Sequence, residues 1–244
     1  MVIGSDRRAQ RRNRRSIEEL DGDGRTRLRR LLEGSWLEIL PTSEVIPLVE
    51  SRNPTGSVSL AVACTDGLGV DHTIAVSEVL AARGYEVTPH LAARLFRSER
   101  HLDEALRRLA HTSINRILVV GGRARTAGPF GTAGALLGAI DEHPDAPAEV
   151  GVAGYPEGLL DVDRERLAER LLTLSSRATF VSTEVTLSPE RFLRWTAEMR
   201  VRGLELPIEV GIPGVVRNAQ LHEDDQSTRR RGGEWHDPTR FVVQ

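Results

Sequence analysis

The sequence has 244 residues, of which 39% are hydrophobic and only 4% are aromatic, so its core must consist mainly of aliphatic side chains. A formal net charge of −2 gives no general case for binding nucleic acid or a membrane, and no apolar run reaches the roughly 18 residues of a membrane-spanning helix. All 33 basic residues are arginines and Cys64 is the single cysteine, which excludes lysine Schiff-base chemistry, an internal disulfide and a multi-cysteine metal site within this chain.

The first 34 residues differ from the rest of the chain. A run of arginines from Arg7 to Arg15 is followed by a polar, helix-like stretch that ends near Leu32. A solvated tail or capping helix and an RNA-contacting arm both fit this composition, but no aromatic side chain interleaves the arginines to stack on bases. We therefore predict an Arg-rich tail at 1–34 and a catalytic domain at 35–244, in a soluble cytoplasmic protein that binds no nucleic acid.

From Trp36 onward the chain is regular. Seven short apolar runs begin 22 to 33 residues apart, which is the length of a strand–helix unit. They begin near Trp36, Val58, Glu86, Arg116, Glu149, Ala178 and Pro207. Segments with helical spacing lie between them, and the clearest repeat is Leu102, Ala105, Leu106 and Leu109. Continuously apolar strands that alternate with amphipathic helices are typical of a parallel sheet covered by helices.

Seven such units in a row favour a (β/α)8 barrel of the TIM type, with a doubly wound open sheet as the alternative. The helix predicted after Ser188-Pro189 carries an apolar stripe that we assign to the core: Phe192, Trp195 and Met199. The eighth unit is atypical, because only residues 241–243 could serve as its strand. The expected fold is thus a barrel whose eighth unit could be incomplete.

The carboxyl ends of barrel strands meet at one mouth, where active sites lie. The side chains expected there are Glu38, Thr65, Asp66, His90, Arg123, Tyr155 and Glu184. Glu38 interrupts the run Trp36–Pro41, and apolar surroundings would raise its pKa toward that of a useful general acid. The alternatives are a Glu38 turned outward to solvent and a His90 that is a hydrogen-bonded core residue.

A glycine-rich segment at 121–131 follows the fourth apolar run and precedes a helix. Close backbone approach at glycines such as Gly122, together with Arg123 and Arg125, could hold a diphosphate at the helix N-terminus. The segment matches neither the phosphate-binding loop of nucleotide triphosphatases nor the dinucleotide fingerprint. No Ser/His/Asp triad and no His-rich metal spacing accompanies it, so we predict no metal site.

Four blocks, in this order, resemble the methylenetetrahydrofolate reductase family. They are Leu37-Glu38-Ile39-Leu40-Pro41, Val87-Thr88-Pro89-His90-Leu91, Gly154-Tyr155-Pro156-Glu157 and Leu206-Pro207-Ile208-Glu209-Val210-Gly211-Ile212. The resemblance implies a (β/α)8 barrel that reduces 5,10-methylenetetrahydrofolate to 5-methyltetrahydrofolate with NAD(P)H, usually through bound FAD, in one-carbon metabolism and methionine biosynthesis. It also implies Glu38 as general acid, His90, Gly122, Arg123 and Tyr155 at the cofactor, and Thr65, Asp66 and Glu184 at the folate.

Several departures from the family pattern concern the flavin. The acid that the family carries after strand four is replaced by Arg123, no lysine remains for the diphosphate, and Glu184 stands where the family has a folate-contacting glutamine. The resemblance is therefore closest to the flavin-free branch, in which NADH passes hydride directly to folate, and we expect purified protein to be colourless. The alternative is a non-catalytic folate- or nucleotide-binding relative that has lost the reaction.

Overall fold

The computed structural model describes residues 22–159, 162–213 and 242–243. The chain divides into two compact units, Met1–Ser35 and Trp36–Gln244. In the first unit the structure describes helix α2 (Gly22–Glu33), on which Asp23 and Arg27 form an ion pair across one turn. The arginine run from Arg7 to Arg15 lies outside the described residues.

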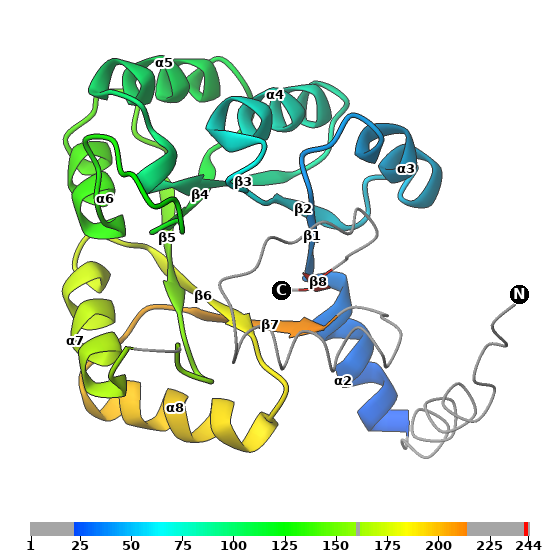
Figure 1. Ribbon diagram of the computed structural model, residues 1–244. Helices are drawn as coiled ribbons and strands as arrows, with labels where there is room; N and C mark the ends of the chain where they lie inside the picture. Colours follow the sequence, from blue (N-terminus) through cyan, green and yellow to red (C-terminus); the bar gives the residue numbers. More distant parts are fainter. Residues whose placement is uncertain (1–21, 160–161, 214–241, 244) are drawn as a thin grey trace, which may run out of the picture. The chain divides into compact units, whose positions relative to one another are not determined.

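The second unit is a closed barrel whose strands follow chain order, with the helices α3 to α8 around them (Figure 1). Seven strands pair in parallel: β1 (Trp36–Ile39), β2 (Ser59–Val62), β3 (Val87–Ala92), β4 (Arg116–Val120), β5 (Glu149–Gly154), β6 (Phe180–Val185) and β7 (Ile208–Pro213). The helices between them are α3 (Val45–Arg52), α4 (Gly69–Ala82), α5 (Glu99–Ala110), α6 (Ala133–Asp141), α7 (Arg164–Ser175) and α8 (Pro189–Val201), with a 3₁₀ turn, η1 (Ala93–Leu95), before α5.

Strand β8 (Val242–Val243) completes the ring and runs against the other seven. Val243 pairs with Leu37 of β1 on one side and Ile212 of β7 on the other, both antiparallel. The TIM-type barrel is thereby confirmed, and the open doubly wound sheet is excluded by the closed strand order. The eighth strand is reduced to two residues and reversed in direction. No helix in the described ranges is long and apolar enough to cross a bilayer.

The main core lies between the strands and the surrounding helices. Alternate strand residues such as Leu60, Leu91 and Val119 point outward into it and are fully buried. The predicted face of α5 is confirmed, because Leu102, Ala105, Leu106 and Leu109 are all buried there. On α8 the Ser188 hydroxyl caps the helix by accepting from the Arg191 N–H, and Met199 and Trp195 of the predicted stripe pack on the core.

The other strand residues point into the barrel, and at the amino-terminal end they pack tightly. The Arg116 guanidinium lies 3.7 Å from the centroid of the Phe180 ring and 4.9 Å from that of Trp36. It also pairs with Glu209 at 2.5 Å. A Cβ on Gly151 would lie 2.2 Å from the Phe180 ring, so only glycine leaves room for it. This floor is filled by protein, which leaves the carboxyl-terminal mouth as the place for a ligand.

Candidate functional site

Glu38 lies on β1 with its carboxylate turned toward the barrel interior. It occupies the same register level as Ala61 of β2, and its Oε1 is 3.9 Å from Nδ1 of His90 on β3. The neighbouring β1 residue Ile39 points the opposite way, into the outer core. The alternation of strand side chains thus brings Glu38 inside, and the outward-turned alternative is wrong.

The environment of Glu38 favours its protonated form. The side chain is three-quarters buried, with 25% of its surface exposed. Desolvation by burial, and secondarily the negative charge of Glu184, raise its pKa from the usual 4.5 to about 7. A carboxyl group that is half protonated near neutral pH can give a proton to a bound molecule and take it back.

His90 is buried on β3, but it is not the satisfied core histidine of the alternative interpretation. Its Nε2 has no hydrogen-bond partner in the described part of the chain, and the 3.9 Å separation from Glu38 is too long for a hydrogen bond. Desolvation by burial lowers its pKa to about 4, so the ring is neutral at pH 7. Two residues earlier on the same face, Thr88 also has a buried hydroxyl with no partner among the described residues. Buried polar atoms are normally paired, so these two mark the interior as a place that receives a polar ligand or water.

Three more candidate residues lie at the mouth, each at the end of a different strand, and their charges affect one another's pKa values. Burial raises the pKa of Tyr155, after β5, to about 12, with Glu184 adding to the rise and Arg123 opposing it. Glu184, on β6, keeps an exposed surface, yet the protein around it desolvates the carboxylate and raises its pKa, while the positive charge of Arg123 acts in the opposite direction. The structure therefore brings Glu38, Glu184, Tyr155 and Arg123 within electrostatic reach of one another.

Thr65 and Asp66 occupy the turn between β2 and α4. The Thr65 carbonyl accepts hydrogen bonds from the N–H groups of Leu68 and Gly69, which starts the helix. Asp66 is exposed, and its charge acts with burial to raise the pKa of Cys64. In the described ranges neither side chain forms a hydrogen bond or ion pair with the other candidate residues. They lie on the mouth side of the barrel, apart from the carboxylate cluster.

The segment at 121–131, here called the strand-four loop, packs on the chain between β3 and α5. Gly122 has φ +79°, and a Cβ there would lie 3.3 Å from the Ala92 Cβ. At Gly128 a Cβ would lie 1.9 Å from the Phe96 carbonyl oxygen, which no side chain could tolerate. From the sequence, glycines here are expected to allow close approach of a ligand. The structure gives these two a different reason: Gly128 lies against the backbone of Phe96, and Gly122 has a positive φ and lies close to the Cβ atoms of Ala92 and Arg94.

Arg94 is a residue of this region that sequence reasoning missed. It stands between β3 and the strand-four loop and donates hydrogen bonds to three loop carbonyls. Its only sequence signal is its place four residues after His90, since an arginine in a single 3₁₀ turn has no pattern of its own. Thr88 was also missed as a candidate, although the period of two from His90 places it on the same face. No cluster of three or more potential metal ligands occurs within the described ranges.

Comparison with known proteins agrees with this architecture. The family model described as methylenetetrahydrofolate reductase matches residues 49–228, which is most of the chain. Methylenetetrahydrofolate reductase 1 of Schizosaccharomyces pombe is 27% identical over 165 residues, covering 54% of this chain. That match covers 27% of the yeast protein, so the chain corresponds to about a quarter of its length. Glu38 precedes the range that the family model matches. On the extent of the family match, the chain belongs to the methylenetetrahydrofolate reductase family.

Proposed function

We propose that the protein reduces 5,10-methylenetetrahydrofolate to 5-methyltetrahydrofolate with NAD(P)H as the hydride donor. The observation that carries this proposal is a carboxyl group inside the barrel mouth, Glu38, whose pKa is raised to about 7. The family membership supplies the reaction class. The site chemistry supplies the proton donor that this reduction needs.

In this proposal Glu38 gives its proton to N10 of the folate as the methylene bridge opens. The C–N10 bond breaks, the bridge carbon becomes an iminium on N5, and that carbon accepts the hydride. The neutral His90 beside Glu38 adds no positive charge, which would otherwise hold the carboxyl group ionised. The negative charge of Glu184 raises the pKa of Glu38 and so keeps the proton on its carboxyl group until the substrate takes it.

The dinucleotide supplies the hydride, and the strand-four loop fits its diphosphate. Arg123 and Arg125 are exposed on this loop, and no amide N–H from 122 to 131 donates to another described residue. Two cations and a row of amide donors that have no acceptor among the described residues are the partners that a phosphate group prefers. NADH and FAD both carry a diphosphate, so this loop alone does not discriminate between them.

We favour NADH acting directly, without a resident flavin. A cation, Arg123, stands where the wider family has an acid near the flavin, and a direct transfer does not require a tuned flavin potential. The purified protein should therefore be colourless. A yellow preparation with flavin absorbance and about one equivalent of FAD per chain would overturn this part of the proposal while leaving the overall reduction in place.

The decisive test is a direct assay of the purified full chain with methylenetetrahydrofolate and NADH, with and without added FAD. We expect oxidation of NADH that depends on the folate and does not require FAD. NADPH in place of NADH, in the same assay, measures the preference between the two donors. The competing function, a folate- or nucleotide-binding relative without catalysis, predicts folate binding by calorimetry but no folate-dependent NADH oxidation under any of these conditions.

A further inference from the structure

Arg94 donates side-chain hydrogen bonds to three carbonyl groups of the strand-four loop, and no other described side chain does so. Its Nε donates to the Ala124 carbonyl at 2.6 Å, its Nη2 to the Arg125 carbonyl at 2.8 Å, and its Nη1 to the Gly131 carbonyl at 3.2 Å. Its backbone N–H donates to the Gly121 carbonyl at 3.1 Å. One half-buried residue of η1, directly after β3, thus connects to both ends and the middle of an eleven-residue segment.

The four hydrogen bonds orient the loop as well as hold it. A guanidinium is planar and presents its donors in a fixed fork, so the three carbonyls that meet it are fixed relative to one another. Because these carbonyls turn toward Arg94, the amide groups of the segment are left to other acceptors. No N–H from 122 to 131 donates to a described residue, which agrees with this orientation.

The packing around Arg94 restricts the loop further. A Cβ on Gly122 would lie 3.5 Å from the Arg94 Cβ, and Gly128 lies directly against the Phe96 carbonyl. The Phe96 ring also meets the Phe130 ring edge to face, with centroids 5.9 Å apart. The loop is therefore held in one conformation before any ligand arrives. A preformed site avoids the entropy cost of ordering a loop on binding.

We infer that Arg94 is a positioning residue for the dinucleotide: it holds the strand-four loop so that its amide groups and Arg123 meet the diphosphate. The inference rests on the proposed function for its ligand, but the effect of Arg94 on the loop is independent of it. Arg94 itself touches no reacting atom. Its removal should weaken dinucleotide binding and leave folate binding and the Glu38 site intact.

The test compares three variants of the full chain: Arg94→Met, Arg94→Lys and Arg97→Met. Arg97 lies three residues further on and pairs with Asp71 instead of the loop, so it is a matched control. Lysine keeps the charge but cannot reach three carbonyls in one plane. Cleavage by trypsin tests the loop without any ligand. Trypsin cleaves the peptide bond that follows Arg125, and the carbonyl of that bond accepts a hydrogen bond from Arg94 Nη2. Cleavage between Arg125 and Thr126 should accelerate about ten-fold or more in Arg94→Met and Arg94→Lys, and stay unchanged in Arg97→Met.

NADH binding is measured on the same variants by fluorescence titration, and folate binding by calorimetry. We expect the Kd for NADH to rise about ten-fold or more in both Arg94 variants, with the Kd for folate within two-fold of wild type. Unchanged tryptic cleavage would overturn the role of Arg94 in holding the loop. Faster cleavage with unchanged NADH affinity would show that the loop is not the dinucleotide site. If wild-type protein binds neither NADH nor folate, the proposed function fails, and with it the ligand assigned to the loop, whereas the cleavage result still decides whether Arg94 holds that loop.

Discussion

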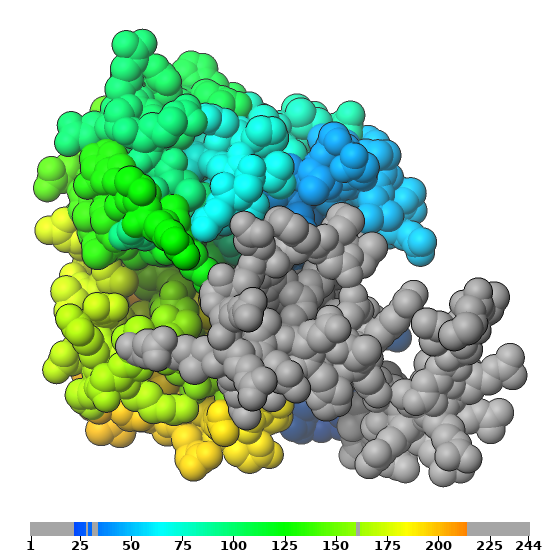
Figure 2. Space-filling model, viewed as in Figure 1, coloured from blue at the N-terminus to red at the C-terminus, as the bar shows by residue number. Residues whose placement is uncertain are grey.

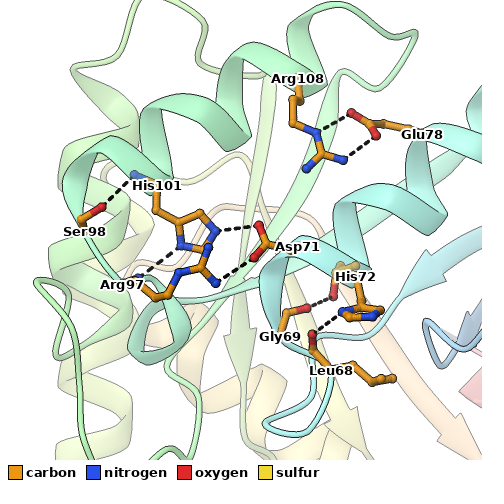
Figure 3. A network of polar contacts seen from close by, with 10 residues as sticks. Leu68, Gly69, Asp71, His72, Glu78, Arg97, Ser98, His101 and Arg108 are labelled. Atoms are coloured by element: carbon orange, nitrogen blue, oxygen red, sulfur yellow. Dashed lines mark hydrogen bonds and ion pairs between the residues drawn. The ribbon is translucent and has the colours of Figure 1, made fainter.

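Two histidine–carboxylate pairs in this molecule have opposite environments. At the barrel mouth His90 and Glu38 lie 3.9 Å apart without a hydrogen bond, and burial raises the pKa of the carboxyl group to about 7. Between α4 and α5, His101 and Asp71 lie 2.9 Å apart (Figure 3). There, partial burial acts to raise the pKa of Asp71, but hydrogen bonds from Arg97 and His101 outweigh it and the pKa is lowered.

The difference lies in how completely the histidine of each pair is hydrogen-bonded. His101 Nδ1 accepts from the Arg97 N–H, so its ring proton is on Nε2 and is donated to Asp71 (Figure 3). Beside it, Arg108 donates two hydrogen bonds to Glu78 and ties the same two helices together. The outer pair therefore holds the fold, whereas His90 of the inner pair keeps a ring nitrogen, Nε2, with no hydrogen-bond partner among the described residues. Unused capacity inside a barrel mouth is typical of a functional site.

The largest expected effect concerns catalysis. Glu38→Gln removes the proton donor with little change in shape, so we expect turnover to fall about 100-fold or more while folate affinity stays within a few-fold. Asp71→Asn makes the same chemical change in the outer pair and should leave turnover within about two-fold. Steady-state kinetics and folate titration check both. Equal turnover in wild type and Glu38→Gln would remove Glu38 from the mechanism.

The pH dependence of the reaction should reflect the ionisation of the same carboxyl group, that of Glu38. Glu38 acts in its protonated form, and its pKa is about 7, so kcat/KM should decline about ten-fold per pH unit once the pH exceeds that value. His90, with a pKa lowered to about 4, stays neutral over this range. Rate measurements from pH 5.5 to 9 test this, and Glu38→Gln should lack the decline near pH 7. A rate that is flat through pH 7 in the wild type would contradict the assignment.

The two pairs should also affect stability with opposite signs. The pKa of Glu38 is higher in the folded than in the unfolded state, so the unfolded state loses its proton first and stability falls as pH rises from 4.5 to about 7. Glu38→Gln should therefore raise the unfolding free energy at pH 8 by up to about 3 kcal/mol, and by about 1 kcal/mol or less at pH 5. Asp71→Asn should lower it by about 1 kcal/mol at pH 8. Urea unfolding at both pH values measures these differences. Destabilisation by Glu38→Gln at pH 8 would contradict a raised pKa of Glu38 in the folded state.

The smallest expected effect is a difference in stability between variants of two buried threonines. Thr88 has a hydroxyl with no partner in the described part of the chain, whereas the Thr73 hydroxyl donates to the Ala63 carbonyl at 3.0 Å. Thr88→Val should be neutral or stabilise the fold by up to about 1 kcal/mol, because it removes an unpaired polar group. Thr73→Val should destabilise it by about 1–2 kcal/mol, because the carbonyl loses its donor. Thermal unfolding of both variants provides the measurement. A loss of stability in Thr88→Val as large as that in Thr73→Val would show that the Thr88 hydroxyl has a partner after all, such as a bound water.

Most of the fold could be predicted from sequence because its signals are local. The repeat of apolar runs locates all seven parallel strands, and the i, i+3, i+4, i+7 spacing identifies the buried face of α5. The direction of β8 could not be predicted, because a two-residue strand has no pattern of its own and pairs wherever neighbouring edges remain open. The boundary of the Arg-rich tail and the roles of Thr65 and Asp66 remain predictions.

The sequence by itself determined which residues are available at the mouth, because strand order and alternation dictate that Glu38, His90 and Glu184 point inward near one another. Only the tertiary structure decided their chemistry. The raised pKa of Glu38 depends on how much water its neighbours exclude and on the distance to Glu184, which lies 146 positions away in the chain. Arg94 illustrates the same limit, since its three acceptors lie 30 to 37 residues away. Long-range desolvation and hydrogen bonding have no local pattern, so only the folded chain reveals them.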